Sequence, residues 1–81
     1  MKKMCEFEIK LNTIEDVKNL VSDVTGFECD FEIISDRFVV DAKSIMGIFS
    51  LDLSKELKLV IRSDDEFEVD RIKNKIKRFI V

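Results

Sequence analysis

Two hydroxyl side chains, Thr13 and Ser44, stand where helices are expected to begin, and they are the groups of this chain best placed for chemistry. A hydroxyl at a helix N-terminus caps free backbone N–H groups, and a phosphate carried there is stabilised by the same N–H groups and by the helix dipole. A hydroxyl becomes a nucleophile only with a general base beside it. Histidine, the most common such base, is absent from all 81 residues. We therefore expect no catalytic residue and no enzyme.

The charges beside the two hydroxyls differ. Glu15 follows Thr13 by two residues and places a negative charge in the first turn of the expected helix. Lys43 precedes Ser44 and adds a cation, which Asp41 partly offsets. Thr13 is therefore assigned the role of a helix cap. For Ser44 two interpretations stay open, a cap alone or a cap that is also a phosphorylation site.

Two cysteines, Cys5 and Cys29, are the other reactive side chains considered. Each occupies an apolar position in an alternating pattern, which is typical of a small buried residue. Two thiols are too few for a disulfide scaffold, and without histidine they do not make a structural zinc site. The sequence contains no phosphate-binding glycine pattern. We expect no metal and no cofactor.

The composition fits a single domain over residues 1–81. Hydrophobic residues make up 46% and charged residues 38%, as in an ordinary globular protein rather than a disordered one. A net charge of −3 argues against nucleic-acid binding. No apolar run approaches the ~20 residues that span a membrane, and no signal-peptide core follows the first residues. The sequence therefore predicts a cytoplasmic protein without a membrane contact.

Periodicity predicts the order βαββαβα. Alternating apolar residues indicate strands over residues 5–11, 27–33, 37–42 and 57–61, and helical spacing indicates helices over 14–24, 45–53 and 64–80. Alternation in the strands means that one sheet face meets the core and the other meets water. Three amphipathic helices can then cover one face only. The expected fold is α/β (α+β), a two-layer open-faced sandwich.

The helix after Ser44 is apolar on nearly every side. Its apolar residues are Ile45, Met46, Ile48, Phe49, Leu51 and Leu53. One face of such a helix packs on the sheet, so some of these side chains are expected to stay exposed, and an exposed apolar cluster often marks a partner site. For Ile45, Met46 and Phe49 both partner contact and plain core burial stay open.

The run Lys43-Ser44-Ile45-Met46-Gly47, followed by Ser50-Leu51, resembles the regulatory-serine segment of the histidine phosphocarrier (HPr) proteins of the sugar phosphotransferase system. The resemblance extends over nearly the whole chain. It implies a four-stranded antiparallel sheet in the order 1-4-2-3, with three helices on one face. The first two strands are not neighbours in that order, which argues against a bridge between Cys5 and Cys29.

The resemblance also implies a lost relay. In the family a histidine opens the first helix, an arginine follows two residues later, and then a proline. Counting back from Ser44 places these positions on Thr13, Glu15 and Asp16. A threonine lacks the near-neutral pKa of imidazole, and its phosphate ester would be a poor donor. The resemblance thus implies the fold and the regulation, but not the phosphohistidine chemistry.

By the same resemblance, Ser44 matches the serine that an ATP-dependent kinase phosphorylates. Ile45, Met46 and Phe49, with Lys43, match the patch that docks partners. The predicted function is a regulatory or binding module of the phosphotransferase family. Its expected protein partner is an HPr-type kinase, a transcription regulator or a phosphotransferase-system enzyme. We expect a monomer; the alternative is a structural or assembly protein that forms a homodimer through the same apolar helix.

Overall fold

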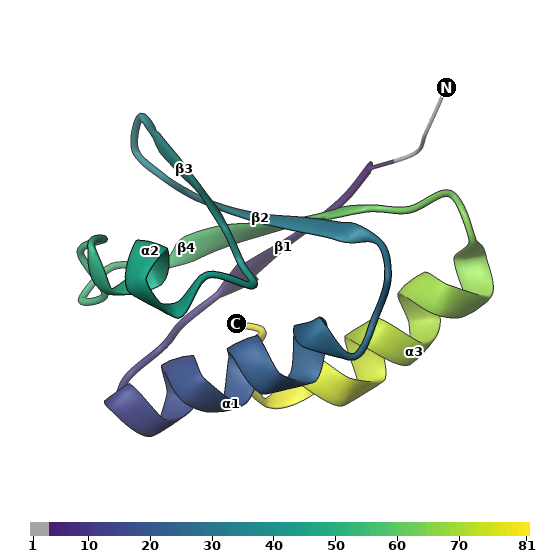
Figure 1. Cartoon of the computed structure of the whole chain (residues 1–81), viewed down its shortest axis with the longest axis horizontal. Helices are drawn as coiled ribbons and strands as arrows, with labels where there is room; N and C mark the ends of the chain where they lie inside the picture. The colour runs from purple at the N-terminus through teal and green to yellow at the C-terminus, as the bar shows by residue number, and fades with distance from the viewer. Residues whose placement is uncertain (1–3) are drawn as a thin grey trace.

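A computed structural model describes residues 4–81 (Figure 1). The strands are β1 (Met4–Ile9), β2 (Asp30–Ser35), β3 (Phe38–Asp41) and β4 (Leu57–Arg62). The helices are α1 (Ile14–Thr25), α2 (Ile45–Phe49) and α3 (Glu66–Ile76), and α3 runs on into a short 3-10 helix, η1 (Lys77–Phe79). The predicted order βαββαβα is confirmed over these residues.

The four strands form one antiparallel sheet in the order β1-β4-β2-β3, which confirms the predicted open-faced sandwich. In Figure 1 the helices lie on one side of the sheet and leave its other face open. Strand β4 is central because it pairs with β1 on one side and β2 on the other. None of the described helices is long and apolar enough to cross a bilayer.

The core lies between the sheet and the helices and takes side chains from both layers. Every second residue of β2 is buried, as the alternation predicts. Val60 departs from this pattern, since it points to the open face yet is only 2% exposed. Val60 lies opposite Glu6 of β1 on one side and opposite Glu32 of β2 on the other. Because β4 is central, these flanking side chains shield Val60 from water.

Several element boundaries differ from the sequence prediction, and three of them are instructive. Strand β2 begins at Asp30 rather than at residue 27, because residues 27–29 bend to connect α1 with the sheet. The first strand ends at Ile9 rather than at residue 11. Helix α2 ends at Phe49 rather than at residue 53. Ser50 tightens its last turn, with its N–H and its Oγ both donating to the Gly47 carbonyl O at 3.2 Å and 2.6 Å.

The two edge strands of the sheet differ in their backbone pairing. Along β1, the chain end supplies backbone partners: Lys10 N–H donates to the Phe79 carbonyl O at 2.9 Å, and Val81 N–H donates to the Glu8 carbonyl O at 3.0 Å. Within residues 4–81, β3 pairs with β2 alone. One edge is therefore partly covered and the other is open.

Candidate functional site

Helix α1 begins with a reciprocal cap. Thr13 has extended backbone angles, and its Oγ1 accepts a hydrogen bond from Asp16 N–H at 3.0 Å. Asp16 Oδ2 in turn accepts from Asn12 N–H at 2.9 Å. Two backbone donors at the helix start are thus satisfied by two side chains. The prediction that Thr13 caps this helix is confirmed.

Carboxylates dominate the first turn of α1. Glu15 and Asp16 both lie in it, where the helix dipole favours negative charge. Glu15 is exposed, and its Oε1 lies 3.8 Å from Lys18 Nζ, an ion pair that water screens strongly. A phosphoryl group arriving at Thr13 would therefore meet two negative charges before it met a firmly held cation.

Helix α2 begins with a looser cap. Ser44 is exposed, and its Oγ accepts from Gly47 N–H at 3.3 Å, near the long end for such a bond. No acidic residue lies in the first turn of α2. Gly47 sits close to the sheet: a Cβ added there would lie 3.3 Å from Ser44 Oγ and 3.4 Å from Val40 Cβ. The small residue lets this short helix rest against β3.

The charge of Lys43 is engaged with the connection between α1 and β2. Its Nζ donates to the Phe27 carbonyl O at 2.7 Å and lies 5.7 Å from the centroid of the Phe31 ring. The side chain is half-buried. The sequence predicts Lys43 as a cation for Ser44 and for a partner. That role stays a prediction, and what the structure shows is a tie between the start of α2 and the end of α1.

The apolar residues of α2 divide into two sets. Ile48 is fully buried, and Ile45 is half-buried and packed against the core. Met46 is 75% exposed and Phe49 is 38% exposed. Core burial therefore accounts for Ile45 in part but not for Met46, and partner contact stays a prediction for all three residues.

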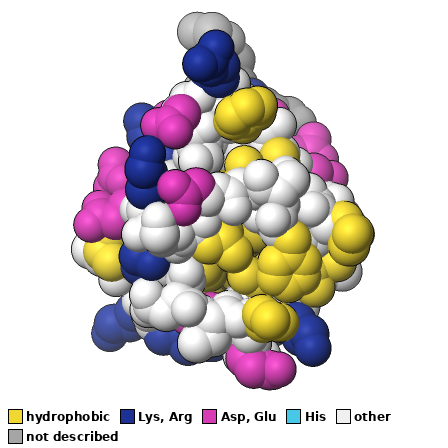
Figure 2. Space-filling view, turned by 90° about the vertical axis from the view of Figure 1, so that its left-hand side faces the viewer, with side chains coloured by type: hydrophobic (Ala, Val, Ile, Leu, Met, Phe, Trp, Pro, Cys, Tyr) yellow, Lys and Arg dark blue, Asp and Glu magenta, His cyan; other side chains and the backbone are white. Residues whose placement is uncertain are grey.

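The sequence pattern did not indicate that Ile14 is exposed in this region. Ile14 falls on the predicted core face of α1, but it is 63% exposed, because it lies in the first turn. Helices α1 and α2 contact each other. Figure 2 views the end of the molecule that carries α2 and the start of α1, and it shows hydrophobic side chains gathered there. We call Ile14, Met46 and Phe49 the α1–α2 surface.

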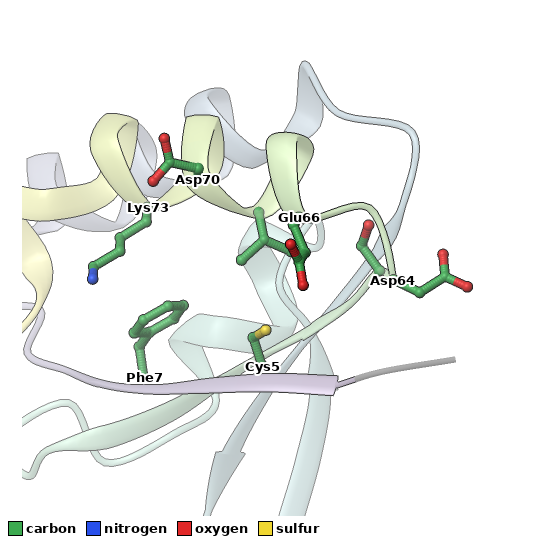
Figure 3. A pocket seen from close by; sticks show the side chains of 8 residues that line it. Cys5, Phe7, Asp64, Glu66, Asp70 and Lys73 are labelled. Carbon is green, nitrogen blue, oxygen red and sulfur yellow. The ribbon is translucent and has the colours of Figure 1, made fainter. Parts of the chain in front are cut away.

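A cavity of about 280 Å³ lies between β1 and α3 (Figure 3). Its lining residues are Cys5, Phe7, Ser63, Asp64, Glu66, Val69, Asp70 and Lys73. Lys73 Nζ lies 5.9 Å from the centroid of the Phe7 ring. In Figure 1 the start of α3 is at the opposite end of the molecule from α2. The cavity therefore does not join the predicted site.

Both thiols are free and half-buried. Burial raises the pKa of Cys29 above its ordinary value, and the charge of Glu68 raises it further. A raised pKa keeps the thiol neutral, which is the opposite of what a reactive cysteine needs. Within residues 4–81 no three side chains are grouped as a metal site. Neither feature adds a reactive centre to the region of Ser44.

Comparisons with known proteins agree on one family. The family model described as "PTS HPr component phosphorylation site" matches residues 16–80. No curated protein matches the chain. The crystal structure of HPr-C-His from Thermoanaerobacter tengcongensis is 34% identical, with a TM-score of 0.66 over 93% of this chain and 96% of that one. The phosphocarrier protein HPr from Bacillus anthracis str. Ames is 23% identical, with a TM-score of 0.64 over 89% and 95% of the two chains, and supports the fold.

The matched segment contains Ser44 and all of α2, and it begins after Thr13 and Glu15. It spans most of the chain and every strand except β1. The strand order is the one that the resemblance of residues 43–51 implies. The chain belongs to the HPr family of the sugar phosphotransferase system.

Proposed function

We propose that this protein is a binding and regulatory module of the HPr family that does not relay a phosphohistidine. The observation that carries the proposal is the turn before α1. There the hydroxyl of Thr13, which by the sequence resemblance stands at the family's histidine position, caps the helix, with Glu15 and Asp16 beside it. No catalytic residue is proposed.

The geometry of Thr13 opposes the relay in two ways. Its Oγ1 already accepts the Asp16 N–H, and the chain has no histidine, whose near-neutral imidazole suits a phosphoryl relay. The charge of Glu15 stands where the family places an arginine, so the site repels the group that an arginine would hold. A threonine phosphate, once formed, would also be too stable an ester to pass on.

The start of α2 supports the regulatory half of the proposal. Ser44 is exposed, and the first turn behind it has no acidic residue. Asp41 is the nearest acid along the chain, and its Oδ1 accepts Lys43 N–H at 2.8 Å. By resemblance to the family, Ser44 is the residue that an HPr-type kinase would phosphorylate. A phosphate there would replace a weak cap by a charged acceptor of the same backbone donors.

The α1–α2 surface is the proposed docking site. Met46 and Phe49 supply its exposed apolar area, with half-buried Ile45 at its base and Ile14 added from the facing helix. Ser44 precedes Met46 by two residues, so a phosphate on it would place two negative charges at the rim of this surface. Partner binding and phosphorylation would therefore be coupled. The proposed partners are an HPr-type kinase, a transcription regulator or a phosphotransferase-system enzyme, all in the cytoplasm.

The first test is intact-protein mass spectrometry after incubation with ATP and an HPr-type serine kinase. We expect one added phosphate, which is absent from Ser44→Ala and retained in Ser54→Ala, a second exposed serine near α2. No addition to the wild-type chain would remove the serine switch from the proposal. A parallel incubation with phosphoenolpyruvate and enzyme I of the phosphotransferase system should add no phosphate, and an acid-labile phosphate there would overturn the loss of the relay.

The docking surface is tested by binding to the same kinase. Met46→Asp should weaken binding at least tenfold, because it places a charge in the centre of the apolar area. Phe67→Asp is the matched control, since Phe67 is 81% exposed but lies on α3. Equal loss in both variants, or none in Met46→Asp, would contradict the assigned surface. The alternative, a homodimer through α2, predicts instead that Met46→Asp lowers the molar mass in solution.

A further inference from the structure

The open edge of the sheet is the exposed side of β3, here called the β3 edge and defined as residues 37–41. Phe38 is 61% exposed and Val39 is 56% exposed. An apolar edge strand without proline or lysine is a template for pairing with another strand. The chain end partly covers the opposite edge at β1, so the sheet protects one side and not the other.

The backbone of Val39 is directed outward. Ala42 N–H donates to the Phe31 carbonyl O at 3.1 Å, which makes these two residues a hydrogen-bonded pair of the β2–β3 ladder. Such pairs alternate along an antiparallel ladder. The next one is therefore Ile33 with Val40, while Ile34 with Val39 is a pair whose N–H and C=O groups face away from each other. Val39 thus offers a donor and an acceptor on the free side of β3.

Two opposite charges flank Val39 at equal spacing. Arg37 precedes it by two residues and Asp41 follows it by two. Within the described part of the chain, none of the ion pairs involves either residue. Asp41 lies opposite Glu32 in the ladder, and the carboxylate of Glu32 is already paired with Arg62 at 2.8 Å. Asp41 is exposed, and its carboxylate accepts the Lys43 N–H at 2.8 Å, which leaves it able to pair with a cation of another chain.

We propose that the β3 edge pairs with the β3 edge of a second copy of this chain, antiparallel, about a two-fold axis at Val39. This register sets Val39 opposite Val39 of the other copy, so their outward groups bond to each other. Arg37 of each copy then lies opposite Asp41 of the other, which gives two ion pairs from one sequence. Phe38 lies opposite Val40. The two sheets join into one.

The faces of the strand agree with this register. Val40 pairs with buried Ile33, so it lies on the helix-covered face, and Phe38 lies on that face as well. Val39 and Asp41 lie together on the open face, and Arg37 stands in the turn that leads into β3. A contact of one short strand buries less than the ~1,600 Å² of a typical stable complex. The dimer is therefore weak and reversible, and it leaves the α1–α2 surface to other partners.

Sedimentation equilibrium tests the pairing. The molar mass should rise with concentration from 9.5 kDa toward twice that value. Arg37→Asp and Asp41→Arg should each weaken self-association about tenfold or more, because each sets like charges opposite each other twice. An equimolar mixture of the two variants should associate again, since one strand then carries two acids and the other two bases. A wild-type chain that stays monomeric up to about 1 mM, or a mixture no tighter than its components, would overturn the proposal.

Val39→Pro supplies an independent variant. Its missing N–H is the outward one, so the bonds between β3 and β2 are kept while the bond at the two-fold axis is lost. We expect a monomer with an unchanged circular dichroism spectrum. Met46→Asp is the control at the other surface and should leave self-association unchanged. Dimerisation that survives Val39→Pro and disappears in Met46→Asp would place the contact on α2 and overturn the β3 pairing.

Discussion

Helices α1 and α2 both begin with a hydroxyl cap, but the residues around the two caps differ. Both helices follow an extended residue whose hydroxyl accepts a backbone N–H three residues on, at 3.0 Å from Thr13 Oγ1 and 3.3 Å from Ser44 Oγ. Around Thr13 the turn is acidic and its cap is reciprocal. Around Ser44 the turn is free of acids and is flanked by an exposed methionine.

Under the proposed function, this difference separates a lost phosphate site at the start of α1 from a retained one at the start of α2. At α1 the hydroxyl of Thr13 is engaged in capping the helix. At α2 the cap is long and the helix has five residues, of which only Ile48 is fully buried. Because the cap of α2 has the longer hydrogen bond and the shorter helix, we expect a phosphate to change the start of α2 more than the start of α1. The predictions below test this contrast.

The largest expected effect comes from releasing α2 from the core. Ile48→Ala removes the only fully buried side chain of this helix and should lower the free energy of unfolding by about 3 kcal/mol. Met46→Ala, two residues away and 75% exposed, should change it by less than about 0.5 kcal/mol. Chemical denaturation of both variants measures the difference. Similar losses of unfolding free energy in the two variants would mean that Ile48 is not the main contact between α2 and the core.

The next largest effect concerns the hydrogen bond by which Lys43, at the start of α2, contacts the end of α1. Lys43→Met keeps the aliphatic stem but removes the charged hydrogen bond to the Phe27 carbonyl O. A charge-assisted bond to a half-buried acceptor makes a loss of about 1.5 kcal/mol the expected result in chemical denaturation. Lys18→Met is the matched control, because its ammonium reaches only exposed Glu15 at 3.8 Å. If both changes were equally mild, Lys43 would be free to serve Ser44 after all.

The sequence predicted the layers and the two caps, because both depend on local patterns. The alternation in residues 27–33, most of which lie in β2, and the hydroxyls before apolar helices can be recognised from the local sequence alone. The exposure of Ile14 and the engagement of Lys43 were not predicted. Ile14 has core spacing but lies in the first turn of α1, and the partner of Lys43 is a backbone carbonyl sixteen residues away. Long-range contacts of this kind leave no periodic trace.

A smaller difference is expected between the two caps themselves. Thr13→Ala should lower the free energy of unfolding by about 1 kcal/mol, the usual loss for an N-cap. Ser44→Ala should lower it by about 0.5 kcal/mol, because its hydrogen bond is longer and its helix shorter. Thermal and chemical denaturation of the two variants side by side give the ranking. A larger loss for Ser44→Ala would reverse the contrast on which the proposed switch depends.

The smallest expected effect is a pH dependence of stability at Cys29, in the connection between α1 and β2 that Lys43 contacts. Burial and then the charge of Glu68 raise the pKa of Cys29 above its ordinary value of 9.0, while Lys43 lowers it. Because the folded chain favours the neutral thiol, this contribution to stability is fully present below pH 9.0 and is lost as the pH rises through the raised pKa. The difference in unfolding free energy between the wild type and Cys29→Ala should therefore shrink from pH 8 to pH 10.5. Lys43→Met should shift this loss to higher pH, since it removes the cation that favours the thiolate; a shift to lower pH would show that Lys43 does not act on Cys29 as its position implies.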